Sequence, residues 1–441
     1  MSAAVRRSFA SLEIRNYRLY FGGQVVSLAG NWMQIVAELW LVLLLTGSGV
    51  AVGLATALQF SGILLFGAIG GALADRFDKR KLLIVANTAF AITAILFALL
   101  VASGVVVLWH VFVFAALLGV ANAVETPVRQ SFVSELVDLP LLPNALALSA
   151  ATFNVARIGG PALAGVALAL FNTGPVFLIA TALSVAPIFS YTAMRARDLN
   201  RSTARPSAAD TRIADGLKYV WKRHDLLLPI ALMAAVGMIG FNFPVTLAAL
   251  AKINFHAGPS TFGLLTTALA VGALGGALAG SGRRSRPGAY VVLGAALAFG
   301  VFEVAVGFAP NFIVAMILLV PTGFFSIYLA QAANHRVQMG VHAAYRGRVM
   351  ALYVLVFLGT TPIGASLAGW WGEHFGVPSS IWAGGIISFA AAVLALIWQL
   401  RVSGDRLSVK ARPHPHLSLV RTAADEEIIE PAAAEPARAA A

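Results

Sequence analysis

Twelve apolar segments, each long enough to cross a lipid bilayer as a helix, recur along this chain of 441 residues. One crossing needs about 20 mainly apolar residues. Only 11% of the residues are charged, against roughly a quarter in an ordinary soluble domain. The sequence therefore predicts an all-α membrane protein with spans at 19–45, 50–74, 82–103, 107–125, 145–170, 174–194, 226–250, 259–280, 289–308, 311–333, 348–371 and 378–400.

Basic residues lie almost entirely on one side of the predicted membrane. If the N-terminus is cytoplasmic, every Lys and Arg falls in the termini or the even-numbered turns, except Lys252 in an outer loop and Arg157 inside a span. Excess Lys and Arg in cytoplasmic loops is the usual orientation signal of membrane proteins. The net charge of +12 therefore indicates orientation rather than nucleic-acid binding, and it predicts a cell-membrane protein with both termini in the cytoplasm.

The only long internal loop splits the chain into two parts of similar length. We divide the chain into a cytoplasmic N-terminus, a six-helix half, a cytoplasmic central loop, a second six-helix half and a tail, at 1–18, 19–194, 195–225, 226–400 and 401–441.

The loop and the tail differ in composition. From 213 to 224, apolar residues recur at helical spacing with basic residues between them, which predicts either an amphipathic helix at the inner membrane surface or a solvated linker. The tail is rich in Ala, Pro and mixed charges. Because it is too poor in large apolar groups to bury a core, we expect 401–441 to be disordered.

The two halves contain related segments. GAIGGALAD at 67–75 and GALGGALAG at 272–280 agree at seven of nine positions, and GGPALAG at 159–165 returns as TTPIGASLAG at 360–369. In both pairs the two segments are separated by nearly the same number of residues. The members of each pair also lie in equivalent spans of the two halves. Internal repeats of this kind are typical of secondary transporters.

The turn between the second and third spans carries the most specific motif of the chain, Gly71-Ala-Leu-Ala-Asp75-Arg76-Phe-Asp78-Lys79-Arg80-Lys81. It resembles the cytoplasmic signature of the major facilitator superfamily. The resemblance implies a fold of two pseudo-symmetric six-helix bundles, with Asp75 engaging neighbouring helices in the outward-open state. It also implies a cytoplasmic latch made of Gly71, Asp75, Arg76, Lys79 and Arg80. The second copy of the motif has Gly280 where the first has Asp75.

Two further stretches, 126–165 and 241–252, are similar to the branch of this superfamily that contains the enterobactin exporter and macrolide and other drug-efflux carriers. This implies proton-coupled export of a small amphiphilic molecule by alternating access. Gly160-Pro161 resembles a shortened antiporter motif, which favours export over import. Ala115 stands where many proton antiporters of the family place an Arg, so the usual proton relay does not carry over.

Polar residues of the first span share one side of the helix. At 100° per residue they fall within an arc of about 80°, and they are Gln24, Ser27, Asn31, Gln34 and Glu38. Such a stripe points either at an aqueous path or at a seam of interhelical hydrogen bonds. An ionisable residue inside a span usually faces a cavity or a partner, and we hypothesise that Glu38 is the protonatable coupling residue.

In the fifth span, Asn154 and Arg157 are three residues apart and share a face. We hypothesise that Arg157 either tunes Glu38 or binds an anionic substrate. At ~1.5 Å per residue, Arg157 lies about 18 Å along the fifth span and Glu38 about 28 Å along the first. Direct pairing of these two charges therefore depends on the helix boundaries. Glu303 lies about one turn from the outer end of its span, and we expect it to snorkel to the interface.

In the second half, neutral polar residues within the spans are candidates for the substrate cavity or for interhelical hydrogen bonds, chiefly Asn242, Tyr328 and Gln331.

Several chemistries have no counterpart in the sequence. The chain has no Cys, which excludes disulfides and thiolate metal sites, and it has no Gly-Lys dipeptide, which excludes a Walker A loop. We therefore expect no enzyme activity, metal or cofactor, with a proton gradient as the energy source. The expected partners are the bilayer and a small-molecule substrate, with the chain a monomer. Import, lipid or lysolipid flipping, and a non-transporting sensor are the alternatives.

Overall fold

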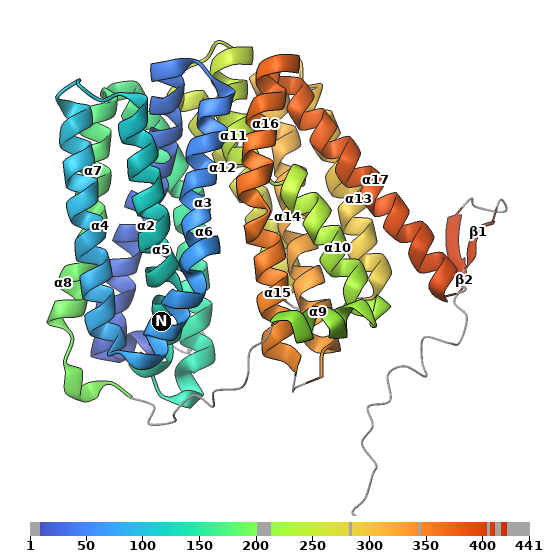
Figure 1. The fold of residues 1–441 in the computed structure, drawn as a ribbon, viewed down its shortest axis with the longest axis horizontal. Helices are drawn as coiled ribbons and strands as arrows, with labels where there is room; N and C mark the ends of the chain where they lie inside the picture. The colour runs from blue at the N-terminus through green and yellow to red at the C-terminus, as the bar shows by residue number, and fades with distance from the viewer. Residues whose placement is uncertain are drawn as a thin grey trace, which may run out of the picture.

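The computed structural model describes residues 9–200, 213–281, 285–342, 345–403, 406–410 and 416–420. Within these ranges, twelve helical segments are long and apolar enough to cross a membrane. The predicted number of spans and the all-α membrane architecture are therefore confirmed. The spans form two bundles, which Figure 1 shows next to each other, one in blue to green and one in yellow-green to red.

The first bundle contains six spans, the last of which is shared by α7 and α8. Its elements are η1 (Ala10–Glu13), α2 (Arg15–Thr46), α3 (Gly49–Arg76), α4 (Lys79–Ala102), α5 (Leu108–Leu136), η2 (Leu139–Leu141), α6 (Leu142–Leu170), α7 (Thr173–Ser184), α8 (Ala186–Ala193) and η3 (Ala196–Asp198).

The second bundle follows the short helix α9 (Ile213–Trp221) and has two interrupted spans. One is made of α10, α11 and η4, and the other of α15 and α16. Its elements are α10 (His224–Ile239), α11 (Phe243–Ala249), η4 (Leu250–Asn254), α12 (Pro259–Ser281), α13 (Ala289–Gly307), α14 (Phe312–Gly340), α15 (Arg346–Gly359), α16 (Thr361–Phe375) and α17 (Val377–Ser403).

An even number of spans brings both ends of the helical region to one face of the protein. We call the face where α2 begins and α17 ends the terminal face, and the opposite one the distal face. Helix α9 lies at the terminal face, as does the N-terminus, at the bottom of Figure 1. The distal face carries the short turns between α2 and α3 and between α16 and α17.

Glycines let equivalent helices approach closely in each bundle. A Cβ added to Gly62 of α3 would lie 2.1 Å from the carbonyl carbon of Gly119 on α5. In the second bundle, a Cβ on Gly272 of α12 would lie 1.8 Å from the carbonyl oxygen of Val320 on α14. Small residues allow such close backbone packing within membranes. The second and fourth helices of each half are thus paired in the same way.

The two bundles join near the distal face. A Cβ on Gly53 of α3 would lie 2.4 Å from the carbonyl oxygen of Ala365 on α16. One turn further out, the Ser48 hydroxyl donates a hydrogen bond of 2.5 Å to the Glu373 carboxylate. Figure 1 shows the bundles touching at the top and diverging toward the bottom. The distal side is therefore the closed side in this conformation.

Two sequence-based expectations differ from the structure. Helix α5 continues through Pro127 to Leu136, so the predicted end of the fourth span at 125 is wrong. The 401–441 segment is also not wholly irregular, because α17 runs to Ser403 and two strands, β1 (Arg406–Lys410) and β2 (His416–Val420), pair antiparallel. Residues 421–441 lie outside the described part of the chain.

Helix α9 falls within 213–224, for which the sequence predicted either an amphipathic helix or a solvated linker. Leu217 and Trp221 are exposed, and so are Lys218 and Lys222, which follow them in the sequence. The backbone of Gly216 packs against Arg348 of α15. The helical alternative is therefore the one observed, and it is attached to the second bundle.

Candidate functional site

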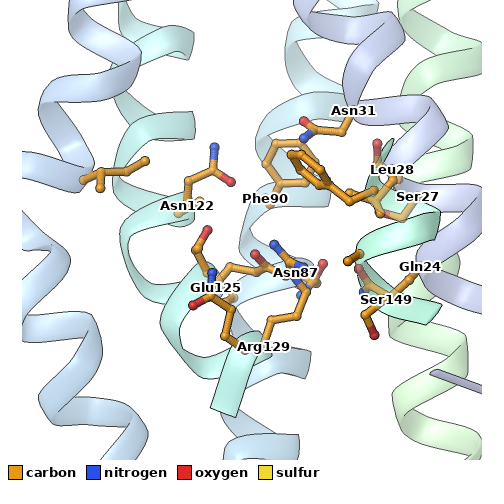
Figure 2. Close-up of a pocket in the computed structure, with 18 of the residues that line it drawn as sticks. Gln24, Ser27, Leu28, Asn31, Asn87, Phe90, Asn122, Glu125, Arg129 and Ser149 are labelled. Carbon is orange, nitrogen blue, oxygen red and sulfur yellow. The ribbon is translucent and has the colours of Figure 1, made fainter. Parts of the chain in front are cut away.

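A cavity of about 580 Å³ lies inside the first bundle. We call it the polar cavity. Figure 2 shows side chains from α2, α4, α5 and α6 projecting into it. Its walls are Gln24, Ser27, Leu28, Asn31, Ile63, Ala86, Asn87, Phe90, Ala121, Asn122, Glu125, Thr126, Arg129, Gln130, Ser149, Ala150, Phe153, Asn154 and Ser184.

The walls of the polar cavity are rich in carboxamides, each able to donate and accept hydrogen bonds. Asn87 and Asn154 donate to the carbonyls of Leu83 and Ala150, one turn earlier on their own helices, which leaves their side-chain oxygens as acceptors. Phe90 adds an aromatic wall. The cavity can therefore hold a solute with several polar groups, and its size is in the range of small-molecule sites.

An ion pair stands in the polar cavity. Arg129 Nε lies 2.8 Å from Glu125 Oε1, one turn away on α5, and both side chains are about one-fifth exposed. Figure 2 shows the two residues together at the base of the view. Sequence reasoning missed this pair because it ended the fourth span at 125. The i, i+4 spacing of opposite charges was the available signal for a helix that continues.

The polar stripe of α2 runs out of this cavity toward the distal side. Gln24 and Asn31 line the cavity, and the Gln24 amide donates to the Tyr191 hydroxyl at 3.0 Å. Further along the helix, Gln34 and Glu38 are buried. Among the described residues, neither polar atom of the Gln34 amide has a hydrogen-bond partner, and neither does Glu38 Oε2. The stripe therefore has a cavity-lining part and a sealed part.

The structure does not bring Glu38 and Arg157 together. A Cβ on Gly160 of α6 would lie 2.4 Å from the Trp32 Cβ of α2. The two helices run in the same direction, so Arg157 is level with residue 29 of α2. Glu38 is nine residues further on, or about 13 Å at ~1.5 Å per residue. The idea that Arg157 tunes Glu38 through contact finds no support in this arrangement.

Arg157 lines a different cavity, of about 210 Å³, at the junction of the two bundles. We call it the apolar pocket. Asn154 lines the polar cavity instead, so Asn154 and Arg157 line different cavities although they share a face of α6. The pocket is enclosed by Trp32, Ile35, Val36, Leu39, Arg157, Phe241, Phe243, Pro244, Leu247, Phe262, Thr266, Leu269, Ala270, Ala273, Ser326, Ile327 and Phe357.

The neutral candidates of the second half are scattered. Asn242 lines a small cavity of about 180 Å³ and donates to the carbonyls of Met238 and Ile239 on the preceding turn. The Tyr328 ring stacks on Phe324 with centroids 5.7 Å apart. Gln331 packs against Gly280, where an added Cβ would lie 2.0 Å from its Oε1. Neither Tyr328 nor Gln331 lines any of the cavities named above.

Glu303 contradicts the expectation that it snorkels. Its side chain is only 3% exposed, and it points into the second bundle. An added Cβ on Gly240 would lie 3.0 Å from Glu303 Oε2, and one on Gly384 would lie 3.2 Å from Oε1. The absence of side chains on these two glycines leaves the space that the carboxyl group fills. Packing between helices thus outweighs proximity to the interface.

The latch motif lies at the terminal face, and two of its basic residues are held within the first bundle. Lys79 Nζ pairs with Glu135 of α5 at 2.5 Å. Arg80 donates to the carbonyls of Tyr191 and Thr192 of α8. Gly71 faces open space and Arg76 is exposed. The side chain of Asp75 lies outside the described part of the structure, so its role stays a prediction.

Three curated relatives align with most of the chain. The staphyloferrin A transporter of Staphylococcus aureus is 26% identical over 375 residues, covering 82% of this chain and 90% of the relative. The multidrug efflux pump Tap of Mycobacterium tuberculosis is 26% identical over 361 residues, covering 78% and 84%. The enterobactin exporter of Citrobacter koseri is 26% identical over 410 residues, covering 87% and 92%.

Solved structures share the fold at lower identity. A bacterial homolog of the human lysosomal transporter Spinster, in an inward-facing and unoccupied conformation, superposes with a TM-score of 0.67 at 13% identity. The match covers 90% of this chain and 96% of that one. A family model described as "Transmembrane secretion effector" matches residues 6–427. The relatives and structural neighbours are transporters rather than enzymes. This chain therefore belongs to the transmembrane secretion effector family of the major facilitator superfamily and is a multi-pass membrane transporter.

Proposed function

We propose that this transporter exports a small amphiphilic molecule, a siderophore or drug-like compound, from the cytoplasm and is driven by the proton gradient. The excess of Lys and Arg in the loops of the terminal face supports a cytoplasmic location for that face and for both chain ends. Export is favoured because relatives over most of the chain are named for siderophore transport and drug efflux. In this proposal the chain acts as a monomer and needs no bound cofactor.

The conformation fits the loading step of such a cycle. The polar cavity lies beside the part of α2 nearest the terminal face, and the bundles are joined near the distal face by Gly53 and Ser48. A solute would enter the cavity from the cytoplasm while the outer side is closed. Rocking of one bundle against the other around a fixed site, the usual mode of such repeats, would then open the distal side.

The observation that carries proton coupling is the polar stripe of α2. It begins in the polar cavity at Gln24 and ends in the sealed region at Glu38, whose Oε2 has no partner. A carboxyl group without a counter-charge in a dry region is favoured in its neutral form. When the distal side opens and water reaches Glu38, the ionised form becomes acceptable. Glu38 would therefore bind a proton in one conformation and release or exchange it in the other.

The test is transport by the purified protein in proteoliposomes. Uptake of a catecholate siderophore, a macrolide and a lysophospholipid would be compared with and without an imposed proton gradient, in vesicles with the terminal face outward. We expect gradient-dependent accumulation of a siderophore or macrolide. Gradient-independent movement of the lysophospholipid alone would replace the proposal with a flippase, and accumulation only in the reverse orientation would replace it with an importer.

A further inference from the structure

Arg157 is a positive charge at membrane depth with no counter-charge. It lies on α6 inside a span and is half-buried, and the described residues offer its guanidinium no hydrogen bond or ion pair. The other cavity arginine, Arg129, is paired with Glu125 on its own helix. Charged groups inside membranes are costly and are normally paired. With no partner among the described residues, the Arg157 guanidinium is available to bind a ligand.

A second hydrogen-bond donor lines the same pocket. The indole Nε1 of Trp32 is buried and has no hydrogen-bond partner in the part of the chain that the structure describes. Phe153, Arg157 and Gly160 lie on one face of α6, at the i, i+4, i+7 spacing. The Phe153 ring contacts the Trp32 ring with centroids 6.0 Å apart, and Gly160 packs against the Trp32 Cβ. Arg157 is thus placed between two contacts to Trp32, and both residues line the apolar pocket.

The rest of the apolar pocket supplies no competing acid. The hydroxyls of Thr266 and Ser326 donate to the carbonyls of Phe262 and Gly323 on their own helices. Aromatic and aliphatic groups from both bundles make up the remaining walls. A ligand here meets the Arg157 guanidinium, with the Trp32 indole beside it, against a low-polarity surface. This chemistry suits an anionic group attached to a hydrocarbon or aromatic body, and it disfavours a cation.

We propose that Arg157 and Trp32 form an anion-binding subsite, and that the transported solute is an anionic amphiphile. This inference rests on the proposed function and names its substrate class. The anionic group would bind between the guanidinium and the indole N–H, with the apolar body among the aromatic side chains. Asn154, on the same face of α6 as Arg157 but in the polar cavity, would lead the polar part of the solute toward the subsite.

The experiment measures binding of three congeners that share one hydrocarbon body. The probes are 1-pyrenebutyrate, its primary amide and the corresponding amine, titrated against the full chain in phosphatidylcholine nanodiscs, with empty nanodiscs to correct for partitioning. We expect the wild-type protein to bind the carboxylate roughly tenfold or more tightly than the amide, because ionic hydrogen bonds are about twice as strong as neutral ones. The amine should bind most weakly.

Three variants isolate the role of the charge. Arg157→Gln should weaken carboxylate binding at least tenfold and leave amide binding within twofold, while Arg157→Lys should retain part of the carboxylate preference. Lys252, predicted in an outer loop, lies in η4 at the distal end of its span and outside both cavities. Lys252→Gln removes this other basic group and should leave the preference intact. Thermal unfolding of each variant checks the fold.

Two outcomes overturn the subsite. The first is equal affinity of the wild-type protein for the carboxylate and the amide. The second is an equal loss of affinity for all three congeners in a folded Arg157→Gln variant, which would mean that Arg157 only shapes the pocket. The proposed function fails separately. Gradient-driven export of neutral or cationic solutes without carboxylate preference removes the subsite alone, and carboxylate preference without gradient-driven transport removes the proton-coupled export alone.

Discussion

The two halves share an architecture but use it differently. In the first, α2 is unbroken, and its polar stripe joins the polar cavity to the buried Glu38. In the second, the equivalent span breaks between α10 and α11, and Asn242 stands there with its amide bonded to its own helix. The buried acid of the second half, Glu303, is enclosed by Gly240 and Gly384 inside one bundle. Duplication therefore preserved the packing frame, while the polar chemistry diverged.

The largest expected effect separates the two buried acids. Glu38→Gln should lower gradient-driven transport at least tenfold and spare exchange down a concentration gradient, because an amide cannot carry the proton. Glu303→Gln should leave transport within about twofold, since its site faces neither cavity. Both are measured in proteoliposomes. If Glu303→Gln is the variant that uncouples transport, the coupling site belongs to the second half and the comparison is reversed.

The duplicated glycine motif offers a second comparison, at Gly67 and Gly272. An added Cβ on Gly272 would lie 1.8 Å from the Val320 carbonyl oxygen, whereas one on Gly67 meets only an Ile63 methyl at 3.9 Å. Gly272→Ala should cost about 1–3 kcal/mol of unfolding free energy through overpacking. Gly67→Ala should be neutral or stabilise by up to about 1 kcal/mol, through the lower chain entropy of Ala. Unfolding titrations in mixed micelles test this, and equal losses would refute it.

A third test concerns the seal between the halves. Gly53→Val should push α3 from α16, because a Cβ there would lie 2.4 Å from the Ala365 carbonyl oxygen. The distal side should then open more often. The chain has no Cys, so a single Cys at Gln34 can report this opening by labelling with an impermeant maleimide. We expect labelling to rise severalfold, and Gly22→Val, which meets open space, is the matched control. Unchanged labelling would show that these helices do not form the seal.

The smallest effects lie at the terminal face, where each half has its own charge cluster. In the second half, Asp225 accepts from both Arg223 and Arg286, and its bond with Arg223 raises the pKa of that guanidinium. In the first half, Lys79 pairs only with Glu135 among the residues that the structure describes. Asp225→Asn, which weakens two charged hydrogen bonds, should cost about 1–2 kcal/mol, and Glu135→Gln, which weakens one and keeps an acceptor oxygen, less than about 1 kcal/mol. Thermal unfolding in detergent measures which variant loses more stability, and the opposite order would contradict this contrast between the two halves.

Much of the fold followed from local patterns. Apolar length predicted the twelve spans, and the repeated glycine segments predicted two related halves, because membrane helices must satisfy their backbone internally and leave a long apolar signal. The end of α5 did not follow. Pro127 with the nearby charges Glu125 and Arg129 looked like a loop, and only the packed bundle showed that these charges pair within a continuing helix.

The candidate site was likewise only partly predictable from the sequence. Periodicity alone grouped Gln24, Asn31 and Glu38 on one side of α2, since a helix determines which residues share a face. Which part of that stripe lines a cavity depends on six helices packing around it. The burial of Glu303 likewise depends on glycines far away in sequence, Gly240 and Gly384, which no single segment reveals.

The sequence by itself therefore determined the class of protein, the number of spans, the related segments of the two halves and three of the charged residues placed in the membrane, Glu38, Arg157 and Glu303. Only the tertiary structure decided their partners. It separated Arg157 from Glu38, paired Arg129 with Glu125, and placed Arg157 and Trp32 together in a pocket between the bundles. The physical reason is that a helix sets the depth and direction of its own side chains, whereas a partner is supplied by neighbouring helices through close packing.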